Sequence, residues 1–267
     1  MIDSFIAQYQ QASDDELARA LVHTAGTLAT EMRDNGLETD YKTSISDVVT
    51  EADRAAEAFV AGVLGALRPD DGVLGEEGAA RESSSGRTWV IDPVDGTYNF
   101  TSNSDYFCSA LALVAGSPSE PDELLFGAID RPIPGQAWFG GPLVGSTLNG
   151  SDLPVLEERS LEEISLATYL HPTFLGDDTV RDTWVKVASQ PATIRMFGAG
   201  SVDLAQVASG RVGAWMQHSV ADWDWLPGKA LVEGTGGAAI KVDAGGKTWC
   251  VAGNKRAAAQ ICELLAQ

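Results

Sequence analysis

Residues 89–97 read Trp-Val-Ile-Asp-Pro-Val-Asp-Gly-Thr, an apolar run that ends in two carboxylates three positions apart, Asp92 and Asp95. The apolar run predicts a buried strand that breaks into a turn. Pro93 has a fixed φ and favours an extended backbone at the residue before it. Gly96 permits either a positive φ or the close approach of a ligand to the backbone.

Two interpretations of this turn remain open on the nine residues alone. Asp-Pro and Asp-Gly pairs are common in ordinary surface turns. Alternatively, the carboxylates of Asp92 and Asp95 converge while the Val94 carbonyl points outward, and such hard oxygen ligands suit Mg²⁺.

Two further acidic motifs lie in apolar surroundings. Glu76 belongs to Val-Leu-Gly-Glu-Glu (73–77) at the end of a short apolar stretch, and Asp224 belongs to Asp-Trp-Asp-Trp (222–225) at the start of a predicted helix. Each alone is compatible with a solvated loop or a helix cap. Thr50 and Asp53 have the spacing of a capping box, which is more often structural than functional.

Together Glu76, Asp92, Asp95 and Asp224 would form a four-carboxylate cluster if the fold brings them together. At about 5 Å each pair repels by roughly 3 kcal/mol at an effective dielectric near 20. A phosphate ester dianion could not bind to this −4 cluster alone, whereas three Mg²⁺ ions leave a charge of +2 that matches it. The arithmetic explains how so acidic a chain could bind an anionic substrate.

Composition excludes several classes of protein. Hydrophobic residues make up 44% of the 267, which argues against a disordered chain. A net charge of −20 disfavours nucleic acids and anionic membranes as partners. No apolar run reaches the roughly 18 residues of a membrane span, and no secretion signal begins the chain. Three scattered cysteines predict neither disulfides nor a CxxC metal site, so we expect a cytoplasmic protein.

The hydrophobic pattern changes along the chain and predicts an α+β or α/β protein with two sheet-bearing subdomains. We expect an N-terminal α+β subdomain over 1–147 and a C-terminal α/β subdomain over 148–267. Helices are predicted at 3–33, 51–67, 173–189, 198–207, 224–234 and 254–266, the last capped by Asn254. Strands are predicted at 89–92, 107–116, 123–130, 136–141, 164–170, 193–197, 212–217 and 237–242, with a loop at 79–87 and a hairpin at 145–154.

The acidic motifs resemble those of the inositol monophosphatase family, within the larger group that includes fructose-1,6-bisphosphatases and nucleotide 3′-phosphatases. The resemblance rests on Gly-Glu-Glu (75–77), on 89–100, on the Gly-Ala-Gly-Ser-Val-Asp segment from 198 to 215, and on 223–237, in that order. It spans residues 47 to 237, and the combination of these motifs is highly specific.

The resemblance implies a layered α-β-α-β-α sandwich, usually dimeric, that is Mg²⁺-dependent and lithium-sensitive. One Mg²⁺ would be held by Glu76, Asp92 and the Val94 carbonyl, and a second by Asp92, Asp95 and Asp224. A third would lie by Glu76 with mostly water ligands. Asp47 and Thr97 would orient and activate a water that attacks phosphorus in line, with no covalent intermediate.

The resemblance also implies the residues that contact the substrate. The Gly96 and Thr97 amides would receive the phosphate. The alcohol part would be contacted by Asp95, Gly198, Ala199, Gly200, Gln217 and Asp224. The sequence departs from the family at Gln217, where inositol phosphatases commonly have Glu, at Tyr98, where the residue is usually small or polar, and at Leu226-Pro227. The metal ligands are unaffected by these differences, which bear on the identity of the substrate.

We expect hydrolysis of myo-inositol monophosphate, with histidinol phosphate, fructose 1,6-bisphosphate and 3′-phosphoadenosine 5′-phosphate as alternatives. Two other interpretations were weighed. The aspartyl-nucleophile phosphatases have the signature DxDGT, whereas Asp92 and Asp95 are separated by one residue more. A non-enzymatic acidic protein that binds divalent cations would need neither Asp47 nor Thr97.

Substitution of these two residues distinguishes an enzyme from a cation-binding protein. Asp47→Asn and Thr97→Ala should retain Mg²⁺ binding and lose most turnover, because both residues are expected to act on the attacking water. Metal titration and phosphate release measure the two properties separately. Wild-type turnover in either variant would contradict the role assigned to that residue.

Overall fold

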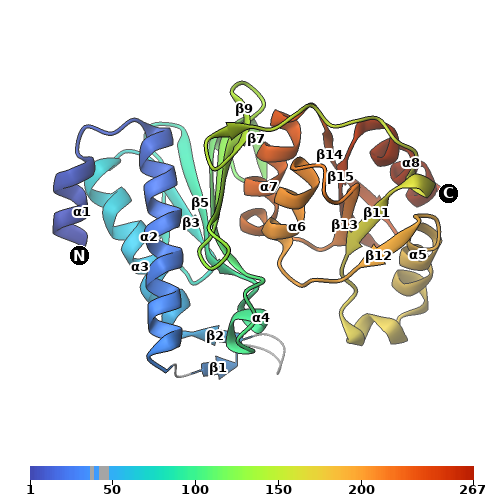
Figure 1. The fold of residues 1–267 in the computed structure, drawn as a ribbon, viewed down its shortest axis with the longest axis horizontal. Helices are drawn as coiled ribbons and strands as arrows, with labels where there is room; N and C mark the ends of the chain where they lie inside the picture. Colours follow the sequence, from blue (N-terminus) through green and yellow to red (C-terminus); the bar gives the residue numbers. More distant parts are fainter. Residues whose placement is uncertain (37–38, 42–47) are drawn as a thin grey trace.

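The computed structural model describes residues 1–36, 39–41 and 48–267, with side chains described outside 37–49. Asp47, an expected catalytic residue, lies outside the described part of the chain. Figure 1 shows five layers: the N-terminal helices, a large sheet, a central pair of helices, a second sheet and an outer pair of helices. The predicted α-β-α-β-α sandwich is confirmed.

The first layer contains three helices rather than the two predicted. These are α1 (Ile2–Tyr9), α2 (Asp14–Asp34) and α3 (Glu51–Leu67). The prediction of one helix over 3–33 was wrong because Ser13 and Glu16 form a capping box that starts a new helix. The capping box of Thr50 and Asp53 at the start of α3 is present as predicted.

The large sheet has the strand order β10-β9-β8-β7-β6-β5-β3-β4. Its central part, from β5 to β8, is an antiparallel meander of strands at the predicted positions, and β3 runs parallel to β5. The segment 79–87, expected to be a loop, includes the short strand β4. The bounds are β3 (Gly72–Gly75), β4 (Ala80–Arg81), β5 (Arg87–Asp95), β6 (Cys108–Ser117), β7 (Glu120–Arg131), β8 (Gln136–Gly141), β9 (Gly145–Leu148) and β10 (Ser151–Asp152). Separately, β1 (Thr39–Tyr41) pairs with β2 (Val48–Thr50).

The second sheet has the order β12-β11-β13-β15-β14 and includes one strand that was not predicted. The missing strand, β15, follows β14 through Gly245 and Gly246, which both have positive φ and make a tight hairpin. The predicted helix over 173–189 is divided into the 3-10 turn η2 and α5. The bounds are β11 (Ser165–Thr168), η2 (Pro172–Gly176), α5 (Asp178–Ala188), β12 (Thr193–Arg195), β13 (Ala214–His218), β14 (Ala238–Ala244), β15 (Lys247–Gly253) and α8 (Lys255–Ala266).

The central helices α6 (Gly200–Ala208) and α7 (Asp222–Gly234) lie between the two sheets and are buried on both sides. Their core includes Trp215 and Trp225, whose rings stack with centroids 5.8 Å apart. At the contact of the two helices, a Cβ added to Gly228 would lie 2.3 Å from the Leu204 Cβ. Close helix packing at this point therefore requires glycine.

The first sheet extends a few residues beyond the boundary at residue 147 that we expected between the two subdomains. The β9–β10 hairpin pairs with β8 and extends the first sheet to Asp152. The two-subdomain division remains a prediction.

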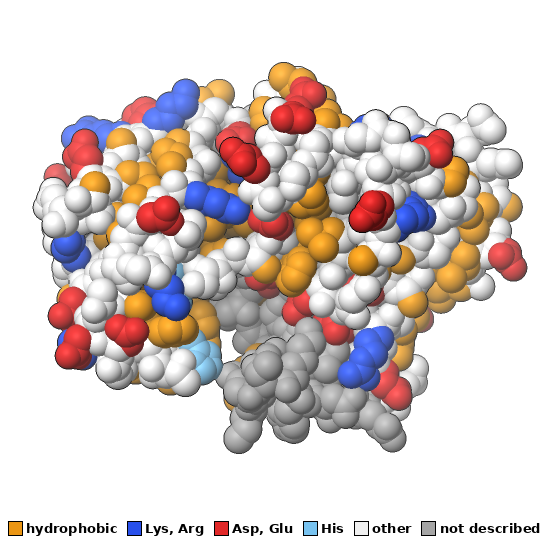
Figure 2. Space-filling view, turned by 180° about the vertical axis from the view of Figure 1, so that it is seen from behind, with side chains coloured by type: hydrophobic (Ala, Val, Ile, Leu, Met, Phe, Trp, Pro, Cys, Tyr) orange, Lys and Arg blue, Asp and Glu red, His pale blue; other side chains and the backbone are white. Residues whose placement is uncertain are grey.

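None of the helices in the described part of the chain is long and apolar enough to cross a membrane. On the face shown in Figure 2, acidic and basic side chains are interspersed and the coloured surface has no broad basic patch.

Replacing Gly228 by Ala should destabilise the fold through this helix contact. We expect the free energy of unfolding to fall by about 1–2 kcal/mol, since overpacking outweighs the roughly 1 kcal/mol gained by removing a helical glycine. Urea unfolding measures the difference. Gly176→Ala is the control because no atom lies within 4 Å of its added Cβ. Equal stability of the two variants would contradict the packing argument.

Candidate active site

The end of β5 brings two carboxylates to one place through a break in the strand pairing. Asp92 pairs with Ala110 and Asp95 with Cys108, so the intervening residues form an irregularity in the register. The Asp92 Oδ1 accepts a hydrogen bond from the Val94 N–H at 3.1 Å. The proline at 93 has no N–H, so the break leaves no donor unsatisfied there.

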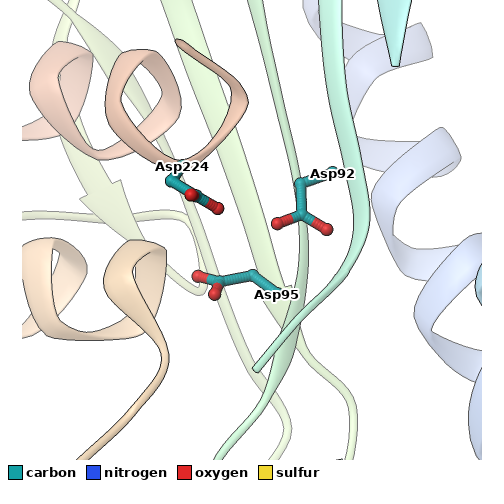
Figure 3. A group of neighbouring side chains, drawn as sticks. All are labelled: Asp92, Asp95 and Asp224. Atoms are coloured by element: carbon teal, nitrogen blue, oxygen red, sulfur yellow. The ribbon is translucent and has the colours of Figure 1, made fainter. Parts of the chain in front are cut away.

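A third carboxylate comes from the first turn of α7, across the boundary between the large sheet and the central helices. Carboxylate oxygens of Asp92, Asp95 and Asp224 all lie within 4.8 Å of one another. Figure 3 shows the three side chains pointing toward a common centre. Asp92 and Asp95 are buried, with 1% and 6% of their surface exposed. Two positions on one strand end and a third far away in the sequence therefore share one site.

Glu76 extends this group from the end of β3. Its charge acts on Asp92, and its side chain lines the same cavity as Asp95 and Asp224. The loop is held by Glu57 on α3, whose buried carboxylate accepts hydrogen bonds from the Glu77 and Ala79 N–H groups, both at 2.7 Å. Glu57 therefore positions the loop that presents Glu76.

The pKa of Asp92 is the one most strongly affected by this group of carboxylates. Burial raises its pKa well above the usual range, and the charges of Glu76, Asp95 and Asp224 raise it further. The neighbouring Asp224 carboxyl group acts in the same direction. Without a cation among them these carboxylates repel one another, so the site favours the protonated form of Asp92.

Asp95 is held from the opposite side by the beginning of α6. Its carboxylate accepts hydrogen bonds from the Gly200 N–H at 3.2 Å and from the Ser201 N–H. Burial raises the pKa of Asp95, while these hydrogen bonds act in the opposite direction. Asp95 thereby caps α6 and connects the first sheet to the central layer.

Thr97 is placed by a second buried carboxylate, that of Asp53. The Thr97 hydroxyl lies 3.1 Å from the Asp53 Oδ1 and 3.0 Å from the Val94 carbonyl oxygen. Gly96, just before it, has φ +92°, and a Cβ there would lie 2.9 Å from the Ala199 Cβ. Gly96 is thus required both by its backbone conformation and by the close approach of the 198–200 segment.

A cavity of about 950 Å³ opens next to the carboxylates. Its lining brings together the residues that the sequence predicted to contact the substrate and several that it did not predict. From the predicted set it contains Asp95, Gly96, Thr97, Gly198, Ala199, Gly200, Gln217 and Asp224. Asp92 and Val94 lie behind this lining, fully buried.

The structure adds residues that the sequence analysis did not assign to the site. Asp53 was recognised only as a helix cap, although it also bonds to Thr97. Glu57 has no local signal, since a Glu within a helical pattern is usually exposed. Tyr169 and Phe197 line the cavity at the ends of predicted strands. The sequence analysis assigned them no role, and only their place in the fold shows that they line the cavity.

Comparison with known protein families adds an independent observation to this geometry. The model described as the inositol monophosphatase family matches residues 10–267. The layered fold and the match over almost the whole sequence define a phosphatase, a phosphoric monoester hydrolase. The chain belongs to the inositol monophosphatase family.

Individual relatives agree with this assignment. The chain is 34% identical to the Nus factor SuhB of Pseudomonas aeruginosa, over 72% of this chain and 71% of that protein. It is 32% identical to an inositol-1-monophosphatase of Caulobacter vibrioides, over 79% and 83%. Among solved structures, the extragenic suppressor protein SuhB of Bartonella henselae superposes with a TM-score of 0.83 at 27% identity, covering 94% of this chain and 98% of that one.

The raised pKa of Asp92 predicts how the metal-free protein responds to pH. Between the unfolded value near 4 and the raised native value, the native state binds more protons than the unfolded state. Stability in EDTA should therefore fall as the pH rises from 5 to 8. Asp92→Asn should reduce this slope and stabilise the metal-free protein at pH 8, as urea unfolding at each pH would measure.

The exposed Asp152 provides the matched control for this experiment, because Asp152→Asn makes the same change of charge away from the cluster. It should keep the pH slope of the unmodified protein. If Asp92→Asn and Asp152→Asn had the same slope, repulsion in the cluster would not account for the pH dependence.

Proposed function

We propose that this protein is a Mg²⁺-dependent phosphomonoesterase that hydrolyses small phosphate esters by direct attack of water. The observation that carries the proposal is the cluster of Asp92, Asp95 and Asp224, with oxygens within 4.8 Å, at the wall of a large cavity. Membership of a phosphatase family supports the reaction class.

The residues fit Mg²⁺ by the chemistry of the donor set. All are hard oxygen donors, and they gather at a separation where carboxylates repel unless a cation lies between them. The pKa of Asp92, raised by burial and by the charges of Glu76, Asp95 and Asp224, is what a cation site without its cation would have. Glu76, Asp92, Asp95, Asp224 and the Val94 carbonyl would hold the ions, two or three in number.

Bound Mg²⁺ would lower the pKa of a coordinated water and neutralise the charge that develops on the leaving oxygen. The chain itself has three tasks. Thr97, fixed by Asp53 and the Val94 carbonyl, orients the attacking water, and we assign Asp47 to the same task. The N–H groups of Gly96 and Thr97 receive the phosphate. Glu57 holds the loop of Glu76 in place.

Among the candidate substrates we rank myo-inositol monophosphate first, because the chain belongs to the inositol monophosphatase family. Relatives named inositol-1-monophosphatase and fructose-1,6-bisphosphatase/inositol-1-monophosphatase support this order. Asp95, Asp224 and Gln217 offer polar groups to hydroxyls, and Gln217 can both donate and accept. Histidinol phosphate, fructose 1,6-bisphosphate and 3′-phosphoadenosine 5′-phosphate remain alternatives. We also infer a homodimer that is sensitive to lithium and acts in a reducing cytoplasm, where the three free cysteines persist.

A Mg²⁺ titration of phosphate release from a panel of esters tests the proposal. We expect activity that EDTA abolishes and Mg²⁺ restores. Asp224→Asn should lower kcat/KM by more than about 100-fold, the upper range for residues that only support a metal ligand. Asp243→Asn, a change on the partly exposed strand β14, should leave activity unchanged.

The configuration at phosphorus distinguishes the route. Direct attack by water is a single displacement and inverts a chiral, isotopically labelled phosphate ester. Retention of configuration, together with a trapped phospho-aspartate on Asp92, would support the aspartyl-nucleophile mechanism instead. Absence of turnover for every ester with Mg²⁺ present would contradict the enzyme proposal itself.

A further inference from the structure

Asn99 lies where three separate segments of the chain meet beside the cavity. It belongs to the short helix α4 (Thr97–Thr101), and its side chain is part of the cavity lining. Its amide nitrogen donates to the carbonyl oxygens of Phe197 at 2.7 Å, Tyr106 at 3.0 Å and Gly198 at 3.3 Å. The Phe197 ring also packs on Tyr106, with centroids 4.8 Å apart. One side-chain amide therefore joins α4, the segment before β6 and the segment before α6.

These contacts restrict the chemistry of the side chain at position 99. A side-chain amide has two N–H donors, whereas carbonyl oxygens only accept, so the donor end of Asn99 faces the three carbonyls. An apolar side chain would leave these oxygens to water. The approach is also close, because a Cβ added to Gly198, which has φ +86°, would lie 3.3 Å from the Asn99 Nδ2. The amide is thus specifically matched to the backbone that it contacts.

The segment that Asn99 contacts, residues 197–200, contributes four neighbouring residues to the cavity lining. At the end of this segment, the Gly200 N–H donates to the Asp95 carboxylate at 3.2 Å. Its beginning belongs to a run of exposed residues, 192–198, that has little burial to hold it. Asn99 therefore fixes the end of the segment that the hydrogen bond to Asp95 does not reach.

The turn of Gly96 and Thr97, which we call the phosphate turn, has supports of its own. The Thr97 hydroxyl lies 3.1 Å from the Asp53 carboxylate and 3.0 Å from the Val94 carbonyl oxygen. The Gly96 carbonyl accepts from the Phe100 N–H at 2.9 Å. Loss of the donors at position 99 would leave this turn in place and free the beginning of residues 197–200.

We propose that Asn99 is a positioning residue for the alcohol part of the substrate, because its side-chain amide sets the place of residues 197–200 relative to the phosphate turn. This role rests on the proposed phosphatase function and adds one residue to it, and the order of the candidate substrates stays the same. Asn99 acts through the backbone of Phe197 and Gly198 and takes no part in the reaction at phosphorus.

Steady-state kinetics with Mg²⁺ present tests the proposal on two variants. Asn99→Ala and Asn99→Leu both remove the donors, and leucine keeps a side chain of similar length. For myo-inositol 1-phosphate we expect KM to rise about fivefold in both variants, the size of one lost hydrogen bond, with kcat nearly unchanged. The inhibition constant of inorganic phosphate, which has no alcohol part, should stay the same because the phosphate turn is intact.

Hydrogen exchange provides a second readout, which does not depend on turnover. The Gly200 and Ser201 N–H groups donate to Asp95, and they should open more readily when the bonds at the beginning of the segment are lost. In both variants we expect peptides over 196–203 to exchange roughly threefold faster and peptides over 87–95 to exchange as before.

Asn35→Ala is the matched control for both measurements. The exposed Asn35 at the end of α2 also donates from its side-chain amide to a backbone carbonyl, that of Glu31 at 2.9 Å, but it does not line the cavity. This variant removes the same kind of bond elsewhere. It should keep the KM for the ester, the inhibition constant of phosphate and the exchange of peptides over 196–203.

The outcomes separate this proposal from the one on which it rests. An unchanged KM in both Asn99 variants, or an equal rise in KM and in the inhibition constant of phosphate, would overturn the positioning role and leave the phosphatase function intact. Unchanged exchange over 196–203 would overturn it as well, whatever the activity. Loss of turnover with every ester in the unmodified protein would contradict the phosphatase function and, with it, the role of Asn99.

Discussion

The repulsion among buried carboxylates dominates the structure around the active site. Asp92, Asp95 and Asp224 are drawn from a strand end and a helix start into a volume where each charge raises the pKa of Asp92. Assembling such a group costs stability in the absence of a cation, and a divalent cation bound as we propose would restore that stability. The rest of the site holds the acids together against this repulsion.

The supporting contacts share one feature, because each joins a carboxylate to another part of the fold. Asp95 accepts from backbone N–H groups in the first turn of α6, Glu57 accepts from backbone N–H groups of the loop after β3, and Asp53 at the start of α3 accepts from the Thr97 hydroxyl. The backbone donors have little freedom to move away, so the hydrogen bonds of Asp95 and Glu57 fix positions more firmly than bonds between long side chains do. The fold itself consequently positions Asp95, Thr97 and the loop of Glu76.

Local patterns predicted much of this arrangement. The apolar run before Asp92 and the Pro and Gly after it determine a strand end and a turn whatever the surroundings, and the meander has clear alternations and turns. Features that depend on tertiary contacts were missed. Residues 247–253 begin with polar side chains, and their strand becomes evident only through pairing with β13 and β14. Glu57 and Phe197 have the local pattern of a surface residue and a core residue, and their true surroundings come from layers distant in sequence.

Asp95 belongs at once to the chemistry of the site and to the architecture of the sandwich. The carboxylate that faces Asp92 and Asp224 also caps the beginning of α6 and joins the large sheet to the helices behind it. A substitution of Asp95 would therefore change the group of acids and remove the acceptor of the first α6 amides at the same time, so the chemistry and the contact between these layers cannot vary independently at this position.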